Sequence, residues 1–320
     1  MWMHAPPLTT VFRRRENDGE PVNDRRLSAR VAHGDIVRIA PGSFVPRSDW
    51  DGLTPMAKHA QRVWEASARA RSRLIVSHHA AAALHGIDRI GEWPTEVDVS
   101  TEPASGGRSS GSIRRHGRRL DGVETLPWLG HLVTTPLQTA IDLTASTRFL
   151  ERVVAADQAL WARRPGGPLV EASALIDGAH SVVGRGSARA ARAADFATSL
   201  ADSVRESQSR VLMSVMGFPP PTLQARFTLS DGSDAFTDFF WREHRHIGEF
   251  DGAGKYRDPA LLRARTPEQV LLLEKDREDD LRRQVAAFSR WRMPALRSPR
   301  SLYDILLGAG LPTSRPRPAR

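Results

Sequence analysis

Three carboxylates interrupt two apolar segments in the C-terminal half of the chain. Asp238 lies in the segment 236–241, and Glu249 and Asp251 lie in the segment 247–252. A carboxylate within a buried strand is costly unless it is paired or binds a cation. Mg²⁺ prefers oxygen ligands, and its sites commonly combine one or two carboxylates with a substrate phosphate. The three residues therefore predict a site for Mg²⁺ or Mn²⁺ beside a phosphate ester.

The expected strand geometry brings these carboxylates together. Side chains alternate between the two faces of a strand, so Glu249 and Asp251 share a face. A turn centred between Glu243 and His244 pairs Asp238 directly with Glu249, with Cβ atoms about 4.5–5.5 Å apart. Like charges at that distance repel, and a divalent ion between them relieves the repulsion and activates a water for attack on phosphorus. A register slip of one residue would turn Asp238 to the other face.

Charged residues in the flanking helices extend this prediction. A lysine near the metal would orient or deprotonate the attacking water, and the candidates are Lys255 and Lys275. The planar guanidinium of arginine suits phosphate because it donates two hydrogen bonds at once. We therefore expect phosphate contacts from Arg210, Arg277 and Arg282.

Several of these residues, taken singly, have purely structural explanations. Asp251 followed by Gly252 is a common turn pair. Glu206, one helical turn before Arg210, would by itself be an ordinary helix-surface charge. His244 and His246 lie at the hairpin turn, and we expect them to face solvent or DNA rather than metal.

The elements that position these side chains follow from periodicity and turn signals, in the order α-β-β-β-α-β-α. Asp231-Gly232 favours a hairpin turn. The helix expected at 266–284 carries Glu274, Lys275 and Glu278 on one face, either towards the site or as a solvated ladder of charges. In chain order, the expected elements are a helix at 202–216, strands at 222–229, 234–241 and 245–251, the helix at 266–284, a strand at 287–293 and a helix at 299–307.

These segments resemble the PD-(D/E)XK nuclease superfamily, in its branch similar to very-short-patch-repair endonucleases. Asp238-Phe239 looks like the DF motif, residues 248–252 look like the E-x-D-G motif, and the helix containing Glu206 looks like the leading helix. The resemblance covers about residues 202–310 and implies a restriction-endonuclease-like αβββαβ core. It implies that Asp238 and Glu249 bind metal and that Glu206 supports the site. Asp251 stands where the motif has a lysine, so Lys255 or Lys275 would take that role.

The N-terminal half carries a different signature. Residues 77–86, Ser-His-His-Ala-Ala-Ala-Ala-Leu-His-Gly, resemble the S-x-x-A-A-x-L-H-G segment of AbiEi-type antitoxins, and residues 34–46 look like the wing that precedes it. The likeness covers about residues 28–160 and implies a transcriptional repressor of a phage-defence toxin–antitoxin pair, with a toxin as partner. Fusion of such a domain to a nuclease-like C-terminus is an actinobacterial arrangement. The structural alternative for 77–86 is a capped, tightly packed helix with His85 as a core histidine.

Composition limits the function classes. The chain has 46 Lys and Arg residues against 37 Asp and Glu, a formal charge of +9, which makes DNA a reasonable partner. There is no cysteine, which excludes disulfides, thiolate nucleophiles and cysteine-bound zinc. No apolar run approaches the roughly 18 residues of a membrane span, and no signal peptide is evident. We expect a cytoplasmic protein with no membrane partner.

The expected fold class is α/β (α+β) in two domains. The leading hypothesis is a metal-dependent endonuclease that hydrolyses phosphodiester bonds in phage defence or DNA repair. The alternatives are a non-enzymatic regulator whose nuclease fold is inactive and an antitoxin that binds only protein. The expected organisation is a polar arm at 1–27, an AbiEi-like domain with a winged-helix remnant at 28–160, a helical linker at 161–201, the nuclease-like domain at 202–310 and a disordered tail at 311–320.

Overall fold

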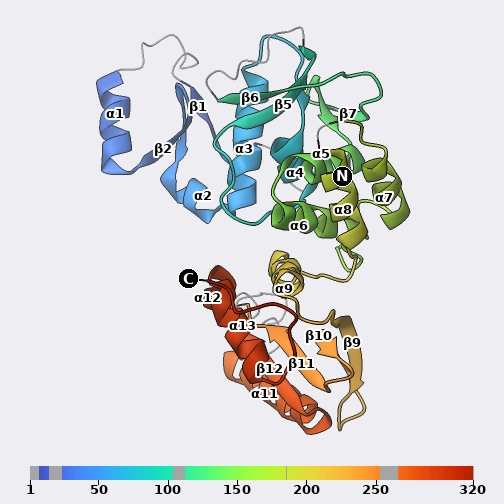
Figure 1. The fold of residues 1–320 in the computed structure, drawn as a ribbon. Coiled ribbons are helices and arrows are strands. Elements are labelled where there is room, and N and C mark those ends of the chain that lie inside the picture. The colour runs from blue at the N-terminus through green and yellow to red at the C-terminus, as the bar shows by residue number, and fades with distance from the viewer. Residues whose placement is uncertain (1–6, 14–23, 104–111, 185, 253–265, 320) are drawn as a thin grey trace. The chain divides into compact units, whose positions relative to one another are not determined.

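The computed structural model describes residues 7–13, 24–103, 112–184, 186–252 and 266–319 (Figure 1). The chain divides into two compact units, one formed by Met1–Leu160 with Pro165–Thr198 and the other by Trp161–Arg164 with Ser199–Arg320. Each unit combines helices with sheets, which confirms the predicted α/β class. Within the described ranges, every helix is too short or too polar to span a bilayer.

A small sheet with strand order β1-β3-β2 begins the N-terminal unit. Gly42 lies in the turn between β2 and β3, where its φ of 73° favours glycine. Strand β1 pairs with β3 through Phe12 and Phe44, so part of the predicted polar arm at 1–27 belongs to this sheet. The elements are β1 (Phe12–Arg13), α1 (Asp24–His33), β2 (Ile36–Ala40), β3 (Ser43–Pro46), α2 (Arg47–Gly52) and α3 (Pro55–Ala68).

A second sheet, with strand order β6-β5-β4-β8-β7, forms the centre of this unit. Helix α4 packs on it through alanines that are almost completely buried, and Gly86 ends the helix with a φ of 75°. The His85 ring contacts the Thr134 carbonyl at 2.7 Å, so His85 is a core histidine as the structural alternative predicts. The elements are β4 (Ile75–Val76), α4 (His78–His85), β5 (Val97–Thr101), β6 (Ile113–Gly117), β7 (Thr125–Trp128) and β8 (His131–Thr134).

A layer of helices completes the N-terminal unit. Leu175, Ala179, Ala190 and Ala194 are buried in a shared core with α5 and α6. Small side chains let these helices approach closely, so most of the segment 161–201 is part of this unit and not the helical linker predicted from the sequence. The helices are α5 (Pro136–Ser146), α6 (Phe149–Leu160), α7 (Ala172–His180) and α8 (Ser187–Phe196).

The C-terminal unit is built on a sheet with strand order β12-β11-β10-β9. The first three strands in the chain are antiparallel neighbours, and β12 joins β11 in parallel. The predicted elements occur in the predicted order, with bounds that differ by only a few residues, and a short helix that was not predicted, α12, lies between β12 and α13. The elements are α9 (Val204–Val215), β9 (Thr222–Thr228), β10 (Asp234–Trp241), β11 (His246–Phe250), α11 (Pro267–Gln284), β12 (Ala287–Trp291), α12 (Met293–Arg297) and α13 (Pro299–Gly308).

Aromatic packing fixes the position of β11 in this sheet. Gly248 lies opposite Phe239 on β10, between the rings of Trp241 and Trp291. A Cβ atom at Gly248 would lie 2.8 Å from the Trp291 ring and 2.9 Å from the Trp241 ring. Protein interiors are close-packed, so this position requires glycine.

The end of the chain is ordered against α9 and α13, unlike the predicted disordered tail. Leu311 is buried, and the Thr313 hydroxyl donates to the Met216 carbonyl at 2.7 Å. The Tyr303 hydroxyl donates to the Arg315 carbonyl at 3.0 Å. The bond to Met216 satisfies a carbonyl at the C-terminal end of α9, and the bond from Tyr303 holds the tail backbone against α13.

Candidate functional site

The hairpin formed by β10 and β11 has the predicted register. Its pairs are Phe239 with Gly248, Phe240 with Ile247 and Trp241 with His246. The turn is therefore centred between Glu243 and His244, as predicted. Asp238 and Glu249 lie one residue beyond the Phe239–Gly248 pair, at the end of the ladder away from the turn.

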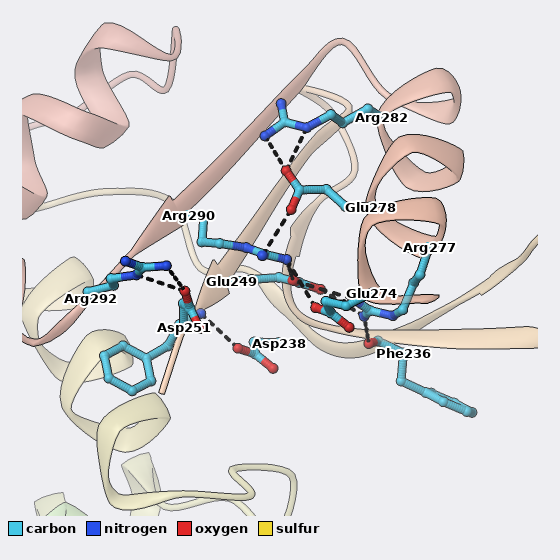
Figure 2. A network of polar contacts seen from close by, with 11 residues as sticks. Phe236, Asp238, Glu249, Asp251, Glu274, Arg277, Glu278, Arg282, Arg290 and Arg292 are labelled. Carbon is cyan, nitrogen blue, oxygen red and sulfur yellow. Dashed lines mark hydrogen bonds and ion pairs between the residues drawn. The ribbon is translucent and has the colours of Figure 1, made fainter. Parts of the chain in front are cut away.

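Glu249 is buried and bound by two arginines (Figure 2). Arg277 on α11 donates to Oε1 at 2.8 Å, and Arg290 on β12 donates to Oε2 at 3.0 Å. Arg277 also donates to the Phe236 carbonyl at 2.8 Å, which fixes its guanidinium beside the strand. Both carboxylate oxygens of Glu249 are thus held by charge-assisted hydrogen bonds, which are shorter and stronger than neutral ones.

The ion pairs extend along α11. Arg290 also contacts Glu274 at 3.2 Å and Glu278 at 2.9 Å, and Arg282 contacts Glu278 at 2.6 Å (Figure 2). The acidic face of α11 is therefore turned towards the sheet rather than forming a solvated ladder. Lys275 is exposed on the same helix, and no contact between it and these carboxylates occurs in the described part of the chain.

Asp251 follows β11 and has a separate arginine partner. Its side chain is only 7% exposed, and Arg292 binds Oδ2 through Nε at 2.8 Å and Nη2 at 2.6 Å. The backbone N–H of Asp251 donates to the Trp291 carbonyl at 2.8 Å. Lys255, the other candidate lysine, lies outside the described residues.

Asp238 and Glu206 form the acidic part of the site. Asp238 accepts a hydrogen bond from the Phe250 backbone N–H at 2.8 Å. Glu206 is buried on α9, so it is not a surface charge, and it accepts from the Asp202 N–H at 2.9 Å and the Ser203 hydroxyl at 2.8 Å. Burial, and then the negative charge of Asp238, raise the pKa of Glu206 to about 8. The two carboxylates are therefore close enough to interact.

The remaining predicted residues have structural partners. Arg277 and Arg282, expected to contact phosphate, bind protein carboxylates, and Arg210 is half-buried on α9. His246 is fully buried and its ring contacts the Ser289 hydroxyl at 2.9 Å, so the expectation that it faces solvent or DNA is wrong. The Trp241 ring packs against it, which explains its burial.

Arginines hold two of the three carboxylates predicted to bind Mg²⁺ in this arrangement. They donate to both oxygens of Glu249 and to Oδ2 of Asp251. Within the described residues, no group of three or more His, Cys, Asp or Glu side chains is arranged to hold a metal ion. Arg290 and Arg292 were not among the site residues predicted from the sequence. Their role follows from the parallel pairing of β11 with β12, which places Arg290 beside Glu249.

Comparison with known proteins identifies relatives whose names give no function. The chain matches no model of a known protein family. It is 29% identical over 193 residues to two Mycobacterium tuberculosis proteins, Uncharacterized protein Rv2248 of strain ATCC 25618 / H37Rv and Uncharacterized protein MT2308 of strain CDC 1551 / Oshkosh. Each match covers 58% of this chain and 66% of the relative, just under two thirds of its length.

Proposed function

We propose that this protein is a non-catalytic, nucleic-acid-binding regulator whose C-terminal unit has an αβββαβ core without hydrolytic activity. The observation that carries this proposal is the state of Glu249, the central carboxylate of the predicted metal site. Both of its oxygens are bound by arginines, Arg277 and Arg290.

Arginine in place of a metal removes the chemistry that phosphodiester hydrolysis needs. A bound divalent ion lowers the pKa of a coordinated water and so supplies a nucleophile at neutral pH. A guanidinium neutralises the same carboxylate but stays protonated and coordinates no water. Arg290 and Arg292, on β12 and directly after it, therefore substitute for the charge of a metal without its reactivity.

Nucleic acid is the partner that the charge supports best. The net charge of +9 comes mainly from arginine, which binds phosphate in a bidentate manner. The resemblance of residues 28–160 to AbiEi-type antitoxins also supports a regulator, for which DNA binding without cleavage is sufficient. Affinity that phosphate contacts supply falls steeply as the salt concentration rises, because added salt reduces the entropy gained when counterions leave the DNA.

The test is DNA binding by fluorescence anisotropy at about 50 mM and 200 mM salt, with EDTA or with Mg²⁺. We expect binding that weakens at least tenfold at the higher salt and is unchanged by EDTA or by Asp238→Asn. Absence of binding at low salt, with co-purification of a second protein, would instead support an antitoxin that binds only protein.

The second candidate is a Mg²⁺-dependent endonuclease, and the Glu206–Asp238 pair favours it. Two interacting carboxylates, one with its pKa raised to about 8, are a repulsive arrangement that a cation would relieve. This candidate requires the pairs Arg277–Glu249 and Arg292–Asp251 to open. Plasmid nicking with Mn²⁺ by the wild type, abolished in Asp238→Ala, would replace the first proposal with this one.

A further inference from the structure

We propose that the N-terminal unit contains a binding site for a phosphate group carried by a ligand of about nucleotide size. The site is a cavity of about 650 Å³ between the start of α4, strands β5 and β6, and helices α6 and α8. This volume is within the roughly 300–1,000 Å³ range of small-molecule sites. The inference is independent of the proposed function, because every residue involved lies in the N-terminal unit.

One wall of the cavity is an aspartate that holds two histidines. Asp98 on β5 is fully buried, with His116 Nε2 at 2.8 Å from Oδ1 and His79 Nδ1 at 3.4 Å from Oδ2. Burial alone would raise the pKa of Asp98, but its bonds with His116 and His79 lower it far below the usual range. Asp98 therefore stays ionised and orients the N–H of His116 towards its Oδ1, as carboxylates do when they orient a histidine.

A third histidine supports this wall. His78 stacks on His116 with ring centroids 3.8 Å apart and an interplanar angle of 15°. Burial, and then the proximity of His116, lower the pKa of His78 to about 3, so this ring is neutral. The backbone of His78 has a φ of 48°, which is rare for a residue other than glycine. Such strain persists where the surrounding structure requires it, commonly at functional sites.

The opposite wall is cationic and has unsatisfied donors. Arg152 on α6 is 8% exposed, lines the cavity, and its Nε has no hydrogen-bond partner among the described residues. Arg89 lines the same cavity and its buried Nε is unsatisfied in the same way. A buried N–H without an acceptor is destabilising, so each of these groups favours a bound acceptor. Arg189 on α8 adds a like charge whose proximity lowers the pKa of Arg152, after burial as the main cause.

A phosphate group satisfies these features together. Its oxygens accept from guanidinium N–H groups in the bidentate geometry that arginine favours. The cavity lining contains Arg89, Arg114, Arg148, Arg152 and Arg189 against Glu92, Asp98 and Glu151, and within the described residues only Arg114 forms an ion pair with a carboxylate outside the lining, Glu96 at 3.0 Å. Arginine therefore outnumbers carboxylate around the cavity, which favours an anion with several acceptor oxygens, such as a phosphate group.

The test uses isothermal titration calorimetry on the full chain with inorganic phosphate, adenosine monophosphate and adenosine. We expect the phosphate-containing probes to bind and adenosine not to bind. A matched pair of oligonucleotides, with and without a 5′-phosphate, distinguishes a small molecule from a nucleic-acid end as the source of the phosphate. Binding of the 5′-phosphorylated oligonucleotide alone would support the phosphate site and assign it to nucleic acid.

The variants place the binding in this cavity. Arg189→Ala removes an exposed arginine that lines the cavity, and Arg192→Ala removes an exposed arginine on the same helix that packs on Phe149. We expect at least a tenfold loss of affinity for Arg189→Ala and less than a threefold loss for Arg192→Ala. Arg152→Met should also lose at least tenfold, with folding checked by circular dichroism. Equal losses in Arg189→Ala and Arg192→Ala, or no binding of any phosphate probe by the wild type, would overturn the proposal.

Discussion

At the scale of single residues, the two acidic parts of the C-terminal site differ in how they affect stability. Glu249 has two arginine partners, whereas Glu206 lies near the negative charge of Asp238. Removing a charge should therefore destabilise the protein at Glu249 and stabilise it at Glu206. A destabilising effect at Glu249 would indicate a structural ion-pair network. In a vacant metal site, by contrast, removal of any ligand carboxylate would relieve repulsion and stabilise the protein.

Glu249→Gln should lower the free energy of unfolding by about 3–5 kcal/mol, because it leaves two partly buried guanidinium groups with one fewer carboxylate. The measurement is urea unfolding followed by circular dichroism. Asp304→Asn is the control, since it breaks an exposed ion pair with Arg317 and exposed pairs contribute little. A variant as stable as the wild type would show that the arginines do not depend on Glu249.

Glu206→Gln should gain stability relative to the wild type as pH rises. The pKa of Glu206 is raised in the folded protein to about 8, so folding favours its protonated form and wild-type stability falls as pH rises from about 4.5 to 8. Between pH 5.5 and pH 8 the difference in stability should change by up to about 3 kcal/mol in favour of the variant. Thermal unfolding at both pH values measures it, with Glu243→Gln in the exposed turn as the control substitution. Parallel profiles for wild type and variant would contradict the raised pKa of Glu206, which burial and then the charge of Asp238 cause.

At the scale of secondary-structure elements, the β10–β11 hairpin packs closely against β12 in the C-terminal unit. Trp241, Gly248 and Trp291 interlock there, while the network around Glu249 joins β11 and β12 to α11. The aromatic packing fixes the position of β11, and this position determines which side chains reach Glu249.

Gly248→Ala should destabilise the C-terminal unit by about 1–3 kcal/mol, because the added methyl group overlaps two tryptophan rings. Gly308→Ala is the matched control, since open space surrounds a Cβ at that position and we expect a neutral or slightly stabilising effect. Urea unfolding compares the two variants. Equal stability would mean that the rings separate without cost, contrary to the close packing of this core.

The elements of the C-terminal unit could largely be predicted from the sequence. Alternating apolar residues and the Asp231-Gly232 turn are local signals, and they located the three antiparallel strands and the register of β10 with β11. The prediction of a linker at 161–201 failed because the alanines of α7 and α8 do not indicate, from the sequence alone, which helices they pack against. The prediction of a disordered tail failed because the bonds that anchor the tail involve Met216 and Tyr303. Met216 is 97 residues from its partner Thr313, and Tyr303 is 12 residues from its partner Arg315.

At the scale of the whole molecule, acid should destabilise the N-terminal unit through histidines buried in neutral form, whereas in the C-terminal unit the effects of His246 and Glu206 oppose each other. Burial is the main cause that lowers the pKa of His59, His85 and His246 to about 4 and of His78 to about 3. A lowered pKa in the folded state means that stability present above the unfolded pKa of about 6.5 is lost as pH falls towards 4.

Thermal unfolding between pH 7.5 and pH 4.5 measures this loss. Three of the four histidines belong to the N-terminal unit, so its transition should decline more than that of the C-terminal unit, which contains His246. His246→Gln should remove an acid-destabilising contribution from the C-terminal transition only, which shifts that transition upwards at pH 4.5 relative to pH 7.5. An equal decline in both transitions, unaffected by this substitution, would assign acid sensitivity to other groups.

The sequence by itself determined the α/β class, the order of elements in the C-terminal unit and the hairpin that carries Asp238 and Glu249. These depend on periodicity and turn chemistry, which act over a few residues. Only the tertiary structure decided that Arg290, 41 residues after Glu249, neutralises it, and that residues as far apart as His78 and Arg189 line one cavity. Such contacts depend on which strands pair and which helix faces meet, and no local pattern in the chain specifies either.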